Sequence, residues 1–217
     1  MLQRPNSVQR IEGRPKSSRH DHVRPSGPQL AIGGALLVSL IFQGAIDPGP
    51  GDWLESSPPI NWNMPGASLP TAPAPYVSPD PRCGAQERPS ESPEEDQVFA
   101  AGWHVFNAAQ VGWHLRLVDG LVGYDGMCRP NQFQGFVFAD GQFVGTISPA
   151  PMDSRTDGVG RILDMRGPAD LIGQFVRYTA NDPLCCPSSV FAVDYTVDRS
   201  GPAPVLMPLR STRINPG

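Results

Sequence analysis

The sequence is short of lysine and cysteine, and both shortages narrow its possible functions. Lys16 is the only lysine, and residues 30–217 carry eleven basic against nineteen acidic side chains. Because phosphate binding requires a clustered basic face, this balance argues against a nucleic-acid partner. The four cysteines form no Cys-x-x-Cys pair and have no histidines at zinc-site spacing, which argues against a redox dithiol or a structural zinc site. We expect no metal and no cofactor.

Long apolar runs are also scarce, since the chain has only one, LAIGGALLVSLIFQGAI at residues 30–46. Its length is at the lower limit for a membrane-spanning helix. Six basic residues lie in the preceding residues 1–29, so the positive-inside rule puts that tail in the cytoplasm and the rest outside. A cleaved signal peptide is the alternative, but cleavage after Ala45 would leave Gln43 where a small residue is required. We therefore expect an uncleaved signal anchor and a location in the cell envelope.

Proline, in contrast, is abundant, and twelve of the 26 prolines fall between Pro48 and Pro93. Such spacing interrupts helices and sheet ladders and favours extended polyproline II structure. We predict that residues 47–91 form a disordered, semi-rigid linker that holds a folded domain off the membrane. A proline motif that binds an aromatic groove is the alternative.

Residues 92–210 carry the patterns of a folded α+β domain, followed by a tail at 211–217. Ser92 and Pro93 are typical of a helix start, and Gly102 is typical of its end. Beyond this point, aromatic and branched residues recur at two-residue spacing, as in strands. The pattern predicts a short helix packed on an antiparallel meander of about six strands.

Two hairpins and one long strand are the clearest local signals. Asp140-Gly141 separates two alternating apolar runs, which is the strongest short-range sign of a two-residue hairpin. Residues 161–165 and 171–178 predict a second hairpin. Residues 189–198 predict a final strand that buries every second side chain.

The four cysteines all follow the apolar segment, which favours structural disulfides in an exported domain. The Cα atoms of the adjacent Cys185 and Cys186 are about 3.8 Å apart, closer than in ordinary disulfides, and extended neighbours point to opposite faces. We therefore expect each to bond a distant partner, Cys83 or Cys128. A bridge from Cys128 to either would close a loop of about 57 residues, worth about 4 kcal/mol.

Asp153, Arg155 and Asp157 form the most polar stretch of the strand region and are the candidate binding loop. A calcium loop of the EF-hand type would require an acid or amide at Arg155 and a distal glutamate, so calcium is not favoured. His104 and His114 stand in a repeated Gly-Trp-His sequence without carboxylates at ligand spacing. We expect a turn closed by aspartate side chains, with a ligand-binding loop as the alternative, and we assign no catalytic residue.

Three stretches, FVFADGQFVGTISP, PMDSRTDG and RYTANDPLCCPSS, resemble the LppP/LprE family of bacterial envelope lipoproteins. The resemblance covers roughly residues 103–209, and DPLCCP at 182–187 is its most specific part. It implies a small exported α+β domain without an established activity. A lipoprotein requires a cysteine directly after its apolar segment, and none lies between Leu30 and Arg82, so we expect an anchor or secretion in place of lipid attachment.

These observations predict a non-enzymatic envelope domain that binds another envelope component through its sheet or through the loop from Asp153 to Asp157. The alternative is a small extracytoplasmic enzyme or ligand carrier that uses this loop and a histidine.

Overall fold

The computed structural model describes residues 53–76, 80–158, 160–183 and 185–214, all within one compact unit, Ala45–Gly217. The predicted membrane segment at 30–46 lies outside the described residues. Within the described part of the chain, no helix is long and apolar enough to cross a membrane.

The described residues form one α-helix, one 3₁₀ helix and ten strands. In chain order they are η1 Pro81–Gln86, α1 Pro93–Ala100, β1 His104–Gly112, β2 Leu115–Leu121, β3 Gly123–Tyr124, β4 Pro130–Asn131, β5 Gln134–Ala139, β6 Gln142–Thr146, β7 Gly160–Met165, β8 Asp170–Arg177, β9 Ser189–Asp198 and β10 Val205–Ile214.

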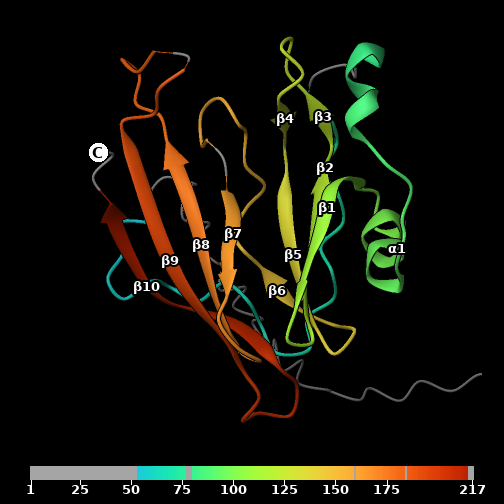
Figure 1. Cartoon of the computed structure of the whole chain (residues 1–217), viewed down its shortest axis with the longest axis vertical. Coiled ribbons are helices and arrows are strands. Elements are labelled where there is room, and N and C mark those ends of the chain that lie inside the picture. Colours follow the sequence, from blue (N-terminus) through green and yellow to red (C-terminus); the bar gives the residue numbers. More distant parts are fainter. Residues whose placement is uncertain (1–52, 77–79, 159, 184, 215–217) are drawn as a thin grey trace, which may run out of the picture. The chain divides into compact units, whose positions relative to one another are not determined.

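The strands form two four-stranded antiparallel sheets and a small two-stranded sheet (Figure 1). The first sheet has the order β1-β2-β5-β6, the second has the order β10-β9-β8-β7, and β3 pairs with β4. The prediction of one helix on antiparallel strands is confirmed. The prediction of a single meander of about six strands is wrong, because the chain changes to a second sheet after β6. The predicted tail at 211–217 is also wrong in part, because β10 extends the fold to Ile214.

Both predicted hairpins are present. β5 and β6 meet through Asp140 and Gly141, both at positive φ, as a two-residue turn between twisted strands requires. β7 pairs with β8, which pairs with β9. Along β9, buried and half-buried side chains alternate without interruption, so the predicted burial of every second residue is confirmed.

The two central strands of the first sheet, β2 and β5, are buried on both faces, which the sequence pattern did not indicate. One face, with Leu117 and Val137, packs against second-sheet side chains such as Phe175 in the main core. The other face, with Phe136, packs beneath Val98 of α1. This produces three layers, in which α1 covers the first sheet and the outer face of the second sheet carries half-buried side chains.

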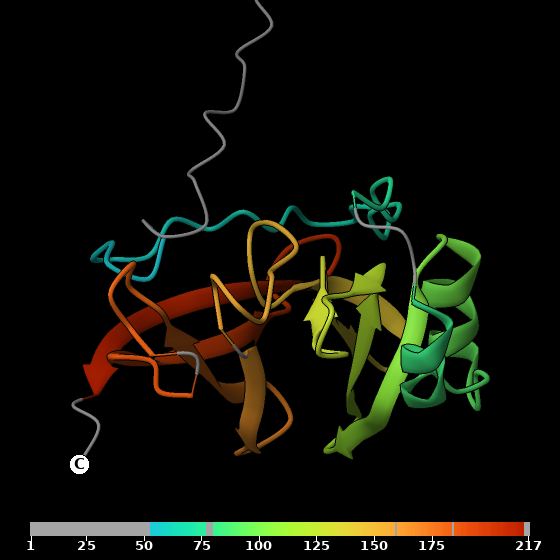
Figure 2. The ribbon, with the colours of Figure 1, turned by 90° about the horizontal axis from the view of Figure 1, so that it is seen from above.

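The proline-rich residues 53–76, named here the strap, pack against both sheets (Figure 2). Trp53 and Leu54 are buried in the main core, and the Trp53 ring lies 4.9 Å from that of Trp62 and 5.0 Å from that of Phe175. The predicted disordered linker is therefore wrong for these residues. Their prolines exclude helix and sheet, but aromatic side chains between the prolines bury enough apolar surface to order the segment.

Asn63 joins the strap to the edges of both sheets. Its Nδ2 donates to the carbonyl oxygens of Thr146 on β6 and Leu206 on β10, each at 3.1 Å, and its Oδ1 accepts from the Thr146 backbone N at 2.9 Å. Gly145 leaves room for this amide, because a Cβ at that position would lie 2.4 Å from the Asn63 Cγ. A single buried amide thus closes the gap between β6 and β10.

Replacing Asn63 with alanine should lower the free energy of unfolding by about 3 kcal/mol, because it leaves buried backbone groups of two strands without partners. Asn61→Ala is the matched control, since among the described residues the Asn61 side chain bonds the backbone of Asn63 and neither strand. Urea unfolding followed by tryptophan fluorescence measures both. An equal loss in the two variants would contradict the bridging role.

The disulfides pair Cys83 with Cys128, at a Cα separation of 5.0 Å, and Cys185 with Cys186. The predicted long bridge from Cys128 to the adjacent pair is wrong for two reasons. First, Cys83 already lies beside Cys128, since Gln86 Nε2 donates to the Cys128 carbonyl oxygen at 2.6 Å. Second, the chain turns at the adjacent cysteines, where the Cys186 N donates to the Pro183 carbonyl oxygen, so the opposed side chains of an extended segment do not apply.

Peptide mapping without reduction should find Cys83 linked to Cys128, and both remaining cysteines in one internally bonded peptide. Replacing Cys83 and Cys128 with serine should lower the free energy of unfolding by about 4 kcal/mol, because the bridge closes a loop of 45 residues. The double serine variant at 185 and 186 is the control and should lose far less, since it closes almost no chain. A peptide linking Cys128 to Cys185 or Cys186 would overturn this pairing.

Candidate functional site

The predicted binding loop folds as a turn closed on its own backbone. The Asp153 carbonyl oxygen accepts from the backbone N atoms of Thr156, Asp157 and Gly158. The Asp157 carboxylate accepts from the Asp153 N at 2.9 Å, and the Asp153 carboxylate accepts from the Gln132 N at 2.8 Å. The loop is thereby attached to Gln132, in the short segment between β4 and β5.

Arginines fix the same loop to the end of β8. The Arg155 guanidinium lies over the Tyr178 ring, 4.9 Å from its centre, rather than in an ion pair with a neighbouring aspartate. Arg177 donates to the carbonyl oxygen of Asp157. Burial lowers the pKa of Arg177 from its ordinary value, and the negative charge of Asp157 opposes that change. Both flanks of the loop are therefore held by the body of the domain.

Asp182, the first residue of the DPLCCP element, organises the neighbouring loop. Its carboxylate accepts from the backbone N and the hydroxyl of Thr179, at 2.8 and 2.7 Å, and from the Ser188 N at 2.8 Å. These hydrogen bonds, led by that of the Thr179 side chain, lower the pKa of Asp182 to about 2. Asp182 therefore closes the loop that carries the exposed Cys185 and Cys186.

Asp153 also lines a pocket of about 410 Å³ between the strap and the first sheet. Four prolines and two aromatic rings form its walls, with amides, hydroxyls and one carboxylate among them. The lining residues are Pro70, Thr71, Pro73, Tyr76, Trp103, Gln132, Gln134, Thr146, Pro149, Pro151 and Asp153. A small concave site with apolar walls and a few polar groups is the usual form of a ligand site.

Tyr76 and Asp153 meet at this pocket. Partial burial, a hydrogen bond to Asp153 and the negative charges of Asp153 and Asp157 all raise the pKa of Tyr76 above its ordinary value. The tyrosine is thus held in its neutral form and donates to the carboxylate. Asp153 is the one carboxylate among the described lining residues and supplies the acidic group of the pocket.

The wall residues outside the loop were not predicted as site residues. Tyr76 lies in the strap, and its partner lies 77 positions later in the sequence, so no local pattern joins them. The two histidines lie elsewhere, since His104 contacts Glu87 at 2.8 Å and His114 lies 3.6 Å from Asp140. In the described ranges, no group of three or more histidine, cysteine or acidic side chains is placed to hold a metal ion.

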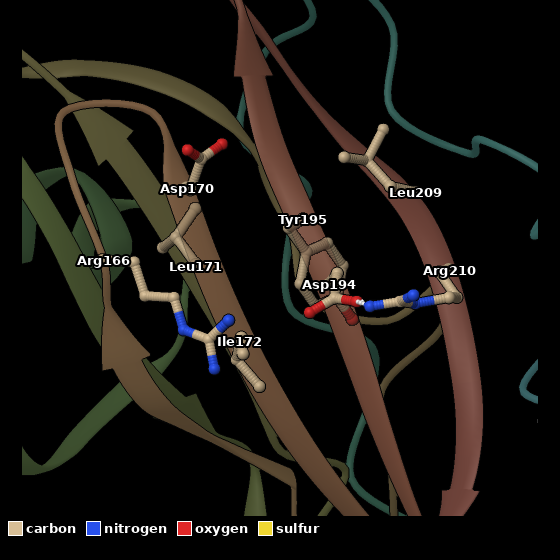
Figure 3. A pocket seen from close by; sticks show the side chains of 8 residues that line it. All are labelled: Arg166, Asp170, Leu171, Ile172, Asp194, Tyr195, Leu209 and Arg210. Atoms are coloured by element: carbon tan, nitrogen blue, oxygen red, sulfur yellow. Dashed lines mark hydrogen bonds and ion pairs between the residues drawn. The ribbon is translucent and has the colours of Figure 1, made fainter.

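A second hollow, of about 460 Å³, lies on the second sheet (Figure 3). Its charged groups are engaged with one another or with neighbours. Arg210 donates to Asp194 at 2.6 Å, Asp170 accepts from Thr196 at 2.9 Å, and Arg166 lies 3.5 Å from Asp164. These pairs lie across neighbouring strands or beside a strand end, and they are typical of a solvated sheet face.

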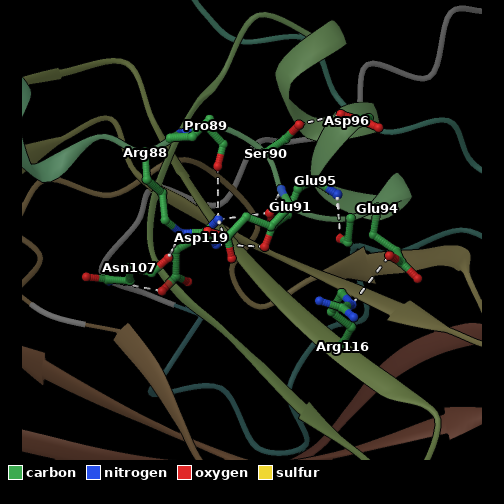
Figure 4. A network of polar contacts seen from close by, with 11 residues as sticks. Arg88, Pro89, Ser90, Glu91, Glu94, Glu95, Asp96, Asn107, Arg116 and Asp119 are labelled. Atoms are coloured by element: carbon green, nitrogen blue, oxygen red, sulfur yellow. Dashed lines mark hydrogen bonds and ion pairs between the residues drawn. The ribbon is translucent and has the colours of Figure 1, made fainter.

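A polar network around Arg88 anchors α1 (Figure 4). Arg88 donates to both oxygens of the buried Glu95, at 2.9 and 2.7 Å, and to the Asn107 carbonyl oxygen at 2.6 Å. The Ser92 hydroxyl accepts from the Glu95 N, so the helix start is capped as predicted. The hydrogen bond from Arg88 lowers the pKa of Glu95. The network ties the helix to β1 and serves the fold.

Together, these features define a disulfide-bonded α+β domain with a pocket at its candidate binding loop. Residues 121–200, from the end of β2 to the turn after β9, match the LppP/LprE lipoprotein family, so the resemblance seen in the sequence is confirmed. No curated protein and no solved structure matches the chain. The family match indicates an envelope lipoprotein, located at the cell envelope or a membrane, and assigns it no reaction or ligand.

Asp119 on β2 should make the stability of the domain depend on pH. Burial raises the pKa of Asp119 to about 6, while a hydrogen bond from Asn107 and the charge of Arg88 oppose the shift. The folded state therefore holds the proton of the Asp119 carboxyl more tightly than the unfolded state does. Protonated Asp119 contributes its full share to the free energy of unfolding below pH 3.8, and this share is lost as the pH rises through about 6. The loss is at most about 3 kcal/mol.

Asp119→Asn should therefore be more stable than the parent protein at pH 7.5 and equally stable near pH 3.5, where both side chains are neutral. Urea unfolding across this range measures the difference. A difference that does not change with pH would contradict the assignment.

Proposed function

We propose that this protein is a membrane-tethered envelope domain that binds a small ligand, without catalysis, in the pocket between the strap and the loop at Asp153. The observation that carries the proposal is the convergence of the predicted loop with Tyr76 on one pocket. Residues 30–46 would tether the domain at the membrane, and the pocket would face the extracytoplasmic side.

The polar side chains of the pocket support binding rather than catalysis. Thr146 and Gln134 hydrogen-bond the backbone of Ser148, and Gln132 donates to the Ala74 carbonyl oxygen, so these groups hold the walls in place. Tyr76 is the lining hydroxyl bonded to a carboxylate, and its raised pKa disfavours the tyrosinate form that a nucleophile needs. A bound ligand would meet fixed donors and acceptors.

The charge of the pocket indicates the ligand class. Asp153 favours ligands with amino or hydroxyl donors and disfavours anions. Aromatic and proline rings offer flat apolar faces beside these polar groups, which suits ring compounds with hydroxyls at their edges. We therefore assign the pocket to a neutral or amino sugar of the kind exposed on envelope glycans.

Three sugars that share the same ring but differ in charge test this assignment. Glucosamine, glucose and glucuronic acid carry a positive charge, no charge and a negative charge, respectively. Titration of the full chain in detergent, followed by ligand-observed NMR, should give a dissociation constant for glucosamine about tenfold below that of glucose, since the charged hydrogen bond adds about 1.4 kcal/mol. Glucuronic acid should not bind.

Asp153→Asn should abolish the preference for glucosamine, whereas Asp157→Asn, outside the pocket lining, should keep most of it. Tyr76→Ala should weaken all sugars, because it removes one wall. Equal binding of the three sugars, or saturable binding of none, would reject the assignment.

A further inference from the structure

The two disulfides of this domain differ in how far solvent reaches them. Cys185 and Cys186 are both exposed, whereas Cys83 is 1% exposed and Cys128 packs against the main core. A disulfide exchanges only when an attacking thiolate reaches one of its sulfur atoms. The domain therefore carries one bond that a thiol in solution can attack and one bond that the fold shields.

The bond between the adjacent cysteines also contributes little to the stability of the fold. The stabilisation by a disulfide grows with the number of residues that it encloses. The bridge from Cys83 to Cys128 encloses a long segment, since its cysteines are 45 positions apart, whereas the adjacent pair encloses none. Among the described residues, neither core cluster includes Cys185 or Cys186. Reduction of the adjacent pair should therefore leave the packing of the domain intact.

Hydrogen bonds hold the loop around the adjacent cysteines independently of their bond. The Asp182 carboxylate accepts from Thr179 on one side and from the Ser188 N on the other. The Cys186 N donates to the Pro183 carbonyl oxygen at 3.1 Å. Because these contacts do not involve the sulfur atoms, the loop keeps the two thiols together after reduction. Two thiols that are held together close their bond again faster than they react with a thiol from solution.

We propose that the bond between Cys185 and Cys186 is a thiol–disulfide exchange site that accepts two electrons from a dithiol partner. The absence of a Cys-x-x-Cys pair does not exclude this chemistry, because the adjacent cysteines are themselves bonded. The bridge from Cys83 to Cys128 is the structural disulfide. The exchange site is independent of the sugar pocket, and the sugar titration uses the oxidised protein.

The exchange proceeds in two steps. One thiolate of the partner attacks a sulfur of the pair, which breaks the bond between Cys185 and Cys186, forms a mixed disulfide and releases the other cysteine as a thiolate. The second thiolate of the partner then attacks the mixed disulfide and releases the remaining cysteine. The partner leaves as a disulfide, and its two protons end on Cys185 and Cys186.

Timed reduction of the full chain tests the proposal. The protein in detergent is treated with dithiothreitol, alkylated with iodoacetamide at intervals and mapped by mass spectrometry. Cys185 and Cys186 should be alkylated at least about tenfold faster than Cys83 and Cys128, because a shielded bond reacts only when the fold opens. Protein reduced at the adjacent pair alone should keep the urea midpoint of the parent. After dithiothreitol is replaced by oxidised glutathione, the bond should form again without a lasting glutathione adduct.

Asp182→Ala and Asp198→Ala are matched variants, since both carboxylates accept from backbone N atoms in turns and only the first turn carries cysteines. Asp182→Ala should retain glutathione on Cys185 or Cys186, because a loosened loop closes the bond more slowly, and Asp198→Ala should behave as the parent. Equal alkylation rates for the two disulfides of the parent would overturn the proposal. A urea midpoint that falls on selective reduction, or a parent pair that stays reduced or glutathionylated, would overturn it as well.

Discussion

The amide of Asn63 lies between the edges of β6 and β10 and bonds both strands. Without it, two sheet edges would meet with backbone groups unpaired in a buried position, which is unfavourable. The amide also holds the strap next to Trp62, whose ring lies 4.9 Å from that of Trp53 in the main core. The closure of the two sheets, one wall of the pocket and the position of the chain entry all depend on this contact.

The ordered strap is part of the folded domain. A proline-rich segment without a docking surface behaves as a spacer, because it cannot form ladders and buries little. Here its aromatic side chains pack in the core, which the described chain joins from Trp53 onward.

The pocket is a product of the same docking. Its walls come from the strap, from the residue before β1, from the β4–β5 junction and from the loop after β6. None of these segments carries a recognisable catalytic or metal-binding pattern. Chemistry at the site depends on the pairing of Tyr76 with Asp153, which requires the strap to fold back over the sheet. The family match over residues 121–200 includes the Asp153 side of the pocket and not the Tyr76 side.

Local patterns in the sequence determined the capped helix at Ser92, the turn at Asp140-Gly141, the alternation along β9, the loop closed by Asp153 and the family resemblance, because each depends on neighbours within a few residues. Tertiary structure alone decided that the strands form two sheets, that Cys83 pairs with Cys128, and that the strap joins the core. These features depend on contacts between residues far apart in the chain, such as Asn63 and Leu206. The packing of the whole domain selects such partners, so the local spacing of residues in the sequence does not reveal them.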